Sequence, residues 1–267
     1  MINCTSRLFI ACCLNITFFA SAIEITIAYE DKEQPPYYME NSLLIPTEKP
    51  GVSVEMIKRL GQMVEGLEIN LIRCPWKRCL YSLKNNLIDG VFNASYKQTR
   101  LDIGWYPTIN GLLEGPVDLS RRIAFISYSF YTLKNSGVEW DGVTISNVNK
   151  RTIGAPRGYS VVTDLQRKGF LVDESPSTKS NLEKLILGRI NVVALQDVTA
   201  DSVIVENPKT FSNINKLQPA FITKAYYLML SHAFVQKHPK IAQQMWDAIK
   251  VIRETEFNNI VTKYNND

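Results

Sequence analysis

The residue types that most often carry out chemistry are sparse in this chain. Its two histidines, His232 and His238, lie near the C-terminal end, and none of the motifs G-x-S-x-G, H-E-x-x-H or G-x-x-x-x-G-K occurs. Two carboxylates brought together in a cleft could still do acid and base work, so an enzyme stays an alternative. The sequence therefore favours binding over catalysis and predicts no catalytic residue and no cofactor.

A pair of cysteines, Cys74 and Cys79, stands in the run C-P-W-K-R-C. In a chain that leaves the cytoplasm, such close spacing predicts a local disulfide. Two free buried thiols are the alternative. A zinc site is disfavoured because only His232 and His238 could join the cysteines, and both are far away in sequence.

The N-terminal stretch, Met1 to Ala22, has the pattern of a secretory signal peptide. Arg7 supplies positive charge, Leu8 to Phe19 is mostly apolar, and Ala20-Ser21-Ala22 has the small-x-small form of a cleavage site. A membrane anchor is the alternative, which two polar residues within the apolar run disfavour. We expect a mature, exported chain that begins at Ile23.

Cleavage at this position changes the cysteine count and the charge. It removes Cys4, Cys12 and Cys13, although a lipoprotein cut before Cys12 is a further alternative. The formal charge of +4 falls to 29 − 26 = +3 because the signal holds one Arg and no acid. Lys and Arg are scattered, so no nucleic acid partner is expected. No later segment is apolar enough to span a bilayer, and we expect a soluble monomer.

The first part of the mature chain alternates strands and helices. Ile23 to Tyr29 places apolar β-branched residues at every second position and predicts a strand. Apolar residues at helical spacing predict a helix over 52–64, with Ser53 as its N-cap. Further strand, helix and strand signals follow at 67–72, 76–86 and 88–92. This order is typical of a parallel sheet with crossover helices.

A second series of the same kind starts beyond residue 122. In chain order it comprises a β-forming run at 123–133, a strand at 152–155, helices at 160–168 and 181–187, and a buried strand at 191–195. The chain closes with an amphipathic helical stretch over 239–264, whose apolar face predicts ordinary core packing. The sequence therefore predicts an α/β protein of two lobes.

Several short motifs follow one another in a recognisable order. They are Pro35-Pro36-Tyr37, Gly51 to Glu55, Leu87 to Gly90, Thr99-Arg100, Trp105-Tyr106-Pro107, Gly158-Tyr159-Ser160, Leu187 to Arg189, and Ile260 to Tyr264. In this order the chain resembles the family 3 extracellular solute-binding proteins, the periplasmic components of ABC importers. The resemblance covers essentially the whole mature chain.

The resemblance implies the type II periplasmic-binding-protein fold, in which the chain crosses a hinge twice and the last helix returns to the first lobe. Here the crossings are expected near 119–124 and 223–227. The implied division gives residues 23–121 and 225–267 to the first lobe and 122–224 to the second.

The resemblance also implies a ligand site between the lobes. The family's Arg at the position of Arg100 grips a ligand carboxylate, and a guanidinium can donate two parallel hydrogen bonds to one. Tyr159 and Ser160 open a helix of the second lobe, where backbone N–H groups attract an anion. A structural Arg and a plain N-cap Ser are the alternatives.

The family often has an acid after the second lobe's buried strand, and this acid pairs with a ligand ammonium. Here either Gln196 or Asp197 takes that position, and Asn191 replaces a frequent Asp. These departures leave an α-amino acid ligand open, and a loop carboxylate without a specific role is the alternative for Asp197.

Aromatic and small polar residues complete the expected site. Tyr37 and Trp76 lie where flat faces could stack on a ligand, whereas structural packing is favoured for Trp105. Asn93 and Ser95 end a strand of the first lobe, so their polar groups could face the cleft.

The implied role is capture of a small, polar, carboxylate-bearing solute, amino acid-like, for an ABC permease in the inner membrane. The protein would act in the periplasm. A ligand-sensing module for a membrane receptor is the first alternative, and a dehydratase-like periplasmic enzyme is the second.

Overall fold

The computed structural model of the chain describes residues 22–148 and 152–264. The elements in chain order are β1 (Ile23–Glu30), α1 (Val52–Met63), β2 (Leu67–Cys74), α2 (Trp76–Lys84), β3 (Gly90–Ser95), two 3-10 turns (Gln98–Arg100 and Leu119–Arg121), β4 (Ala124–Leu133), β5 (Glu139–Trp140), β6 (Ile145–Ser146), β7 (Thr152–Pro156), α3 (Ser160–Arg167), β8 (Leu171–Ser175), α4 (Thr178–Ile186), β9 (Val193–Gln196), α5 (Asp197–Glu206), α6 (Pro208–Phe211), β10 (Ile214–Lys216), β11 (Ile222–Leu230), α7 (His232–Lys237), α8 (Pro239–Thr255) and α9 (Phe257–Thr262). The expected signal peptide, apart from Ala22, lies outside the described residues.

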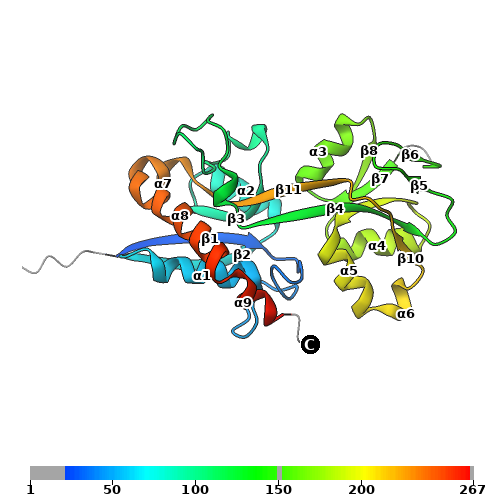
Figure 1. The fold of residues 1–267 in the computed structure, drawn as a ribbon, viewed down its shortest axis with the longest axis horizontal. Helices are drawn as coiled ribbons and strands as arrows, with labels where there is room; N and C mark the ends of the chain where they lie inside the picture. The colour runs from blue at the N-terminus through cyan, green and yellow to red at the C-terminus, as the bar shows by residue number, and fades with distance from the viewer. Residues whose placement is uncertain (1–21, 149–151, 265–267) are drawn as a thin grey trace, which may run out of the picture.

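These elements gather into two groups (Figure 1). Lobe 1 contains β1 to β3 with α1, α2 and the C-terminal helices α7 to α9. Lobe 2 contains β5 to β10 with α3 to α6. The long strands β4 and β11 run side by side from one group to the other.

The sheet of lobe 1 has β1 at its centre. β1 pairs in parallel with β2 along its whole length and with β3 on its other side. The alternating apolar residues of β1 are buried, among them Ile25 and Ile27. Because successive side chains of a strand point to opposite faces, this sheet needs helices on both faces, and the crossover helices supply them.

Lobe 2 repeats the arrangement with β7 between β8 and β9, both parallel to it. In the described part of the chain, β4 and β11 join the two parallel units into one nine-stranded sheet of order β2-β1-β3-β11-β4-β9-β7-β8, with β10 paired to β4. This mixed α/β architecture confirms the fold class expected from the sequence.

The strands β4 and β11 are antiparallel, with Ala124 opposite Tyr226 and Tyr128 opposite Ile222. These pairings place the two connecting strands at the positions where hinge crossings are expected. The assignment of residues 23–121 and 225–267 to one domain and 122–224 to the other stays a prediction.

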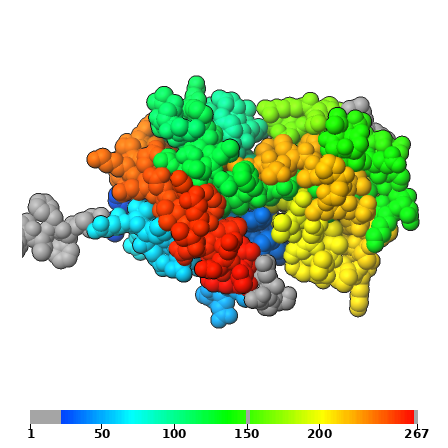
Figure 2. Space-filling view, in the orientation of Figure 1, coloured from blue at the N-terminus to red at the C-terminus, as the bar shows by residue number. Residues whose placement is uncertain are grey.

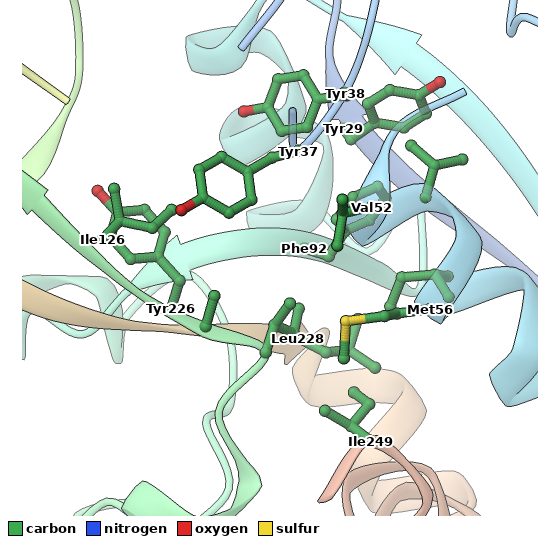
Figure 3. Packing of buried hydrophobic residues seen from close by; sticks show 14 of the residues in the cluster. Tyr29, Tyr37, Tyr38, Val52, Met56, Phe92, Ile126, Tyr226, Leu228 and Ile249 are labelled. Atoms are coloured by element: carbon green, nitrogen blue, oxygen red, sulfur yellow. The ribbon is translucent and has the colours of Figure 1, made fainter. Parts of the chain in front are cut away.

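Aromatic and aliphatic side chains from β1, α1, β3, α8 and the connecting strands pack together in one core cluster (Figure 3). Tyr29 packs against Phe92 with ring centroids 4.9 Å apart, and Tyr38 meets Tyr29 edge-on at 5.6 Å. Such pairs add to the stabilisation that burial of their area provides. The aromatic rings of Tyr29, Tyr38 and Phe92 therefore pack on one another in the lobe 1 core.

Two local expectations are wrong. The N-cap of α1 is Gly51 and not Ser53, because Gly51 has φ +123° and a Cβ there would lie 2.4 Å from the carbonyl oxygen of Tyr37. Asp197 does not lie in a loop, since it is the first residue of α5.

The disulfide between Cys74 and Cys79 is confirmed. It joins the last residue of β2 to the first turns of α2, and Trp76 is one of the four residues between the two cysteines. In the described residues, no helix combines the length and the apolar character that crossing a membrane requires.

Candidate ligand-binding site

A small cavity lies between lobe 1, lobe 2 and the two connecting strands. Its lining residues are Glu30, Gln34, Tyr38, Trp76, Asn93, Ser95, Arg100, Tyr128, Tyr159, Ser160, Gln196 and Tyr226. About 10 Å³ is open to the centre of a water molecule, which is room for one water. A solute can therefore enter only when the lobes move apart.

Arg100, a residue of lobe 1, lines this cavity. It ends a short 3-10 turn after β3 and is 4% exposed. One terminal nitrogen donates to the carbonyl oxygen of Ser95 at 2.8 Å, and the other donates to the carbonyl oxygen of Gly158 in lobe 2 at 3.2 Å. The guanidinium carbon lies 5.6 Å from the centre of the Trp76 ring. The cation is thus fixed in the cavity and oriented by both lobes.

Asn93 supplies a polar group through an irregular backbone. Its φ is +54°, and the pairing of β3 with β11 shifts register at this point. Asn tolerates this left-handed conformation better than most residues, and the irregularity re-aims the side chain. Its Oδ1 accepts a hydrogen bond from the Ser53 hydroxyl at 3.1 Å. Its buried Nδ2 has no partner among the described residues.

Direct contacts close the lobes over the cavity. The hydroxyls of Ser95 and Ser160, one from each lobe, are 2.6 Å apart. Lys97 donates to the hydroxyl of Thr163 at 2.6 Å, and Thr199 donates to the carbonyl oxygen of Pro35 at 3.2 Å. Figure 2 shows the two halves of the molecule meeting along their facing sides. The structure is a closed form.

A buried carboxyl group occupies the other end of the cavity. Glu30, the last residue of β1, is 4% exposed and accepts hydrogen bonds from Tyr159 at 2.5 Å and from Gln34 at 2.6 Å. Burial raises the pKa of Glu30 to about 8, helped by the negative charge of Asp31 and opposed by these two hydrogen bonds and by Lys32. Glu30 is therefore mostly protonated at neutral pH. Gln34 also contacts the Tyr159 hydroxyl.

The third side of the cavity is a group of neutral polar side chains. The hydroxyls of Tyr128 on β4 and Tyr226 on β11 are 2.6 Å apart, and the Gln196 amide donates to both at 3.2 Å. The Gln196 Oε1 is buried without a partner in the described part of the chain. A buried polar atom without a partner is costly, so Gln196 offers an acceptor, and Asn93 a donor, to a guest molecule.

Two residues expected at the site do not line the cavity. Figure 3 shows the Tyr37 ring directed toward Ile126 and Tyr226, and Tyr37 is nine-tenths buried in the core, whereas its neighbour Tyr38 lines the cavity. Asp197 turns away to Lys216, 3.3 Å from its Nζ.

The other seven expected residues are brought together on the wall: Trp76, Asn93, Ser95, Arg100, Tyr159, Ser160 and Gln196. Trp105 bridges to β11 and packs against His232 with ring centroids 6.1 Å apart, as its expected structural role requires. The sequence did not decide between Gln196 and Asp197. Of these two residues, Gln196 lines the cavity and Asp197 does not.

Sequence reasoning missed Glu30, Gln34, Tyr38, Tyr128 and Tyr226. A signal was present for Glu30, because it ends a parallel strand just as Asn93 and Ser95 do, and such ends face the ligand crevice. The two strand tyrosines had no comparable signal, since their meeting depends on the pairing of β4 with β11.

The groups that line the cavity are suited to binding a polar guest molecule. They combine one cation, one protonated carboxyl group, and unpaired amide donor and acceptor groups. Among residues 22–148 and 152–264, no three His, Cys, Asp or Glu side chains converge as metal ligands. Arg100 is the group best suited to a guest's carboxylate, because the site is desolvated and the guanidinium is already oriented.

Comparison by sequence gives no relative. No family model matches the chain, and no curated protein sequence matches it.

Comparison by structure gives many. The arginine-, lysine-, histidine-binding protein ArtJ from the thermophilic bacterium Geobacillus stearothermophilus has a TM-score of 0.70 at 13% identity, covering 92% of this chain and 96% of that one. The GluR0 ligand-binding core from Nostoc punctiforme, in complex with L-glutamate, has a TM-score of 0.69 at 12% identity over 91% and 100%. A histidine kinase sensor domain similar to periplasmic binding proteins has a TM-score of 0.67 at 13% identity over 92% and 97%. This chain therefore has the two-lobed, type II periplasmic-binding-protein fold.

Proposed function

We propose that this protein captures a small, polar, carboxylate-bearing solute, such as an amino acid, between its lobes. The single observation that carries the proposal is the placement of Arg100, buried between the lobes with both terminal nitrogens oriented and with unpaired polar atoms of Asn93 and Gln196 on the same wall. The ligand carboxylate would take hydrogen bonds from Arg100, and its other polar groups would meet the two amides.

Binding would proceed by closure of the lobes around the guest. The ligand first contacts the lobe 1 wall, and lobe 2 then swings over it through bending of β4 and β11. Support comes from the size of the cavity, which has room for one water in the closed form, and from the exchangeable hydrogen bonds that hold the lobes together, such as those of Ser95 to Ser160 and Lys97 to Thr163. The proposed role is binding and not catalysis, because Arg100 and the carboxyl group of Glu30 are both held by hydrogen bonds to the protein.

We propose that the protein acts in the periplasm and delivers its solute to an ABC permease in the inner membrane. The export signal in the sequence and the Cys74–Cys79 disulfide support an oxidising compartment. A sensing role beside a membrane receptor is the second candidate, favoured by the likeness to a histidine kinase sensor domain. Co-purification with a permease, or with a receptor ectodomain, separates the two roles.

The test is a melting-temperature screen of the mature protein against amino acids, short peptides, polyamines and organic acids. A ligand that binds the folded state raises the melting temperature by mass action. We expect carboxylate-bearing compounds to raise it and polyamines to leave it unchanged. Arg59→Ala, which alters an exposed arginine at the α1 surface, serves as the control for general effects of charge. A response to polyamines alone, or no response to any class, would contradict the proposal.

A further inference from the structure

We propose that the ligand extends out of the small cavity into a second, larger subsite, and that it carries a second acidic group there. This inference rests on the proposed function and names the ligand class more closely: a solute with two acidic ends and a flat or apolar middle. The second subsite lies next to the first, and Glu30 and Trp76 line both.

The second subsite has a much larger open volume than the inner cavity. About 280 Å³ is open to the centre of a water molecule there, against about 10 Å³ in the inner cavity. Both lobes build it: Pro75, Trp76 and Lys77 come from lobe 1, and Arg157 and Pro176 come from lobe 2. Lobe closure therefore forms this subsite in the same movement that forms the inner one.

The walls of the second subsite are mainly apolar. Trp76 is 6% exposed, and its position is fixed by the Cys74–Cys79 disulfide around it. Arg100 lies against the Trp76 ring from the inner cavity. A ligand that bound Arg100 and extended into the second subsite would contact Trp76, which lines both, and a flat or apolar segment suits that contact.

The rim of the second subsite carries an excess of positive charge. Lys32 lies 3.5 Å from Asp31, and Lys77 lies 3.8 Å from Glu174, so both lysines have acidic partners. Arg157 has an exposed side chain and makes no ion pair with any described residue. Glu30 does not offset Arg157, because burial keeps its carboxyl group mostly protonated at neutral pH.

Both arginines are connected to the same residue, Gly158. Gly158 accepts the hydrogen bond from Arg100, and Arg157 directly precedes it. A ligand with one acidic group on Arg100 and a second near Arg157 would span Gly158 and Trp76. The acidic group could be a carboxylate or another oxyanion, since a guanidinium recognises both in the same way.

The experiment compares acids of one shape that differ in one group. Terephthalate and 4-methylbenzoate share a flat ring, and adipate and hexanoate share an aliphatic chain; in each pair a methyl replaces the second carboxylate. Affinities for the mature protein are measured by calorimetry. We expect each diacid to bind about fivefold more tightly than its partner, as suits a charge pair that is partly exposed.

Arg157→Ala should remove the preference for the diacid and leave the affinity of the monoacid unchanged. Arg189→Ala, an exposed arginine elsewhere in lobe 2, should keep the preference. Trp76→Leu should weaken the ring pair more than the aliphatic pair.

Equal binding of diacid and monoacid by the unaltered protein, or a preference that survives Arg157→Ala, would overturn the second subsite. Failure of all four acids to bind would overturn it as well. The proposed function is decided separately, by the response of amino acids and other carboxylates in the melting-temperature screen, so the second subsite can fail while the proposed function stands.

Discussion

The two lobes face each other across the cavity with walls of different chemistry. Lobe 1 contributes the cation Arg100 and the protonated, neutral carboxyl group of Glu30, together with Trp76. Lobe 2 contributes only neutral groups, namely Tyr159, Ser160 and Gln196. The difference indicates a division of labour, in which lobe 1 recognises the ligand and lobe 2 encloses it.

The division has a physical cause. A charged group needs a rigid set of partners before it can be buried, and Arg100 finds its own in the carbonyl and hydroxyl oxygens of Ser95, one 3-10 turn away on the same lobe. Lobe 2 must release its contacts each time the cleft opens, and neutral hydrogen bonds such as Ser95 to Ser160 can be exchanged for water at small cost.

The largest expected effect tests this division directly. Arg100→Ala should weaken binding of a carboxylate ligand about 100-fold, or about 2.7 kcal/mol, because two oriented charge-assisted hydrogen bonds are lost. Ser160→Ala on the facing wall should weaken it by less than about fivefold. Calorimetry of both variants provides the measurement. Equal losses would break the comparison between the walls.

The next effect concerns the disulfide, which stiffens the lobe 1 wall. Replacing Cys74 and Cys79 together by Ser should lower the free energy of unfolding by about 2 kcal/mol, as the entropy of so short a loop implies. Urea denaturation measures the loss. Hydrogen exchange should quicken in α2, which carries Trp76, and stay unchanged in α3. Faster exchange in both helices would show that the disulfide does not act on lobe 1 alone.

A third effect concerns the fit between the walls. Gly158 has φ +78°, and a Cβ added there would lie 3.0 Å from the Lys77 Cγ of the other lobe. Gly158→Ala should therefore hold the cleft partly open and weaken binding about tenfold. Small-angle scattering with and without ligand should show the closed form less populated.

Gly188 provides the matched control for this substitution. It has φ +65° with open space around its Cα, so Gly188→Ala imposes backbone strain without a contact between lobes. It should lower stability by about 1 kcal/mol and leave affinity unchanged. A loss of affinity in Gly188→Ala as large as that in Gly158→Ala would assign the effect to strain alone.

The smallest effect is a dependence on pH from Glu30. An exposed glutamate releases its proton near pH 4.5, whereas burial raises the pKa of Glu30 to about 8 in the closed form. Between these values the folded state holds more protons than the unfolded state, so the free energy of unfolding falls as pH rises across this window.

At about 1.4 kcal/mol per pKa unit, the shift from 4.5 to about 8 would correspond to about 5 kcal/mol if the lobes stayed closed. We expect a fall of only about 1 kcal/mol, because the lobes open and hydrate the group at a smaller cost. Glu30→Gln should flatten the dependence between pH 5 and 8 in denaturation curves. A slope that is unchanged in this variant would remove Glu30 as its cause.

Much of the fold could be predicted because its signals are local. The alternation in β1, the helical spacing in α1 and the buried run in β9 each lie within a dozen residues. The strand character of β11 and the helix α5 were not predicted. β11 gains its structure from pairing with β3 and β4, and α5 begins at Asp197 without a capping side chain.

The candidate site divides in the same way. The sequence identified residues at strand ends and helix starts, such as Ser95 and Ser160, since a residue's position within its element decides which way it faces. It expected Tyr37 at the site, whereas Tyr38 lines the cavity, because the loop after β1 follows no period that assigns one tyrosine outward and the other inward.

By itself, the sequence determined most of the order of strands and helices, the local disulfide and the presence of an arginine after β3, because each depends on neighbours along the chain. Only the tertiary structure decided that Glu30 is buried against Tyr159, that Asp197 turns to Lys216, and that a second subsite adjoins the first. These features join residues far apart in sequence, and their energies come from burial and pairing that exist only once the lobes have met.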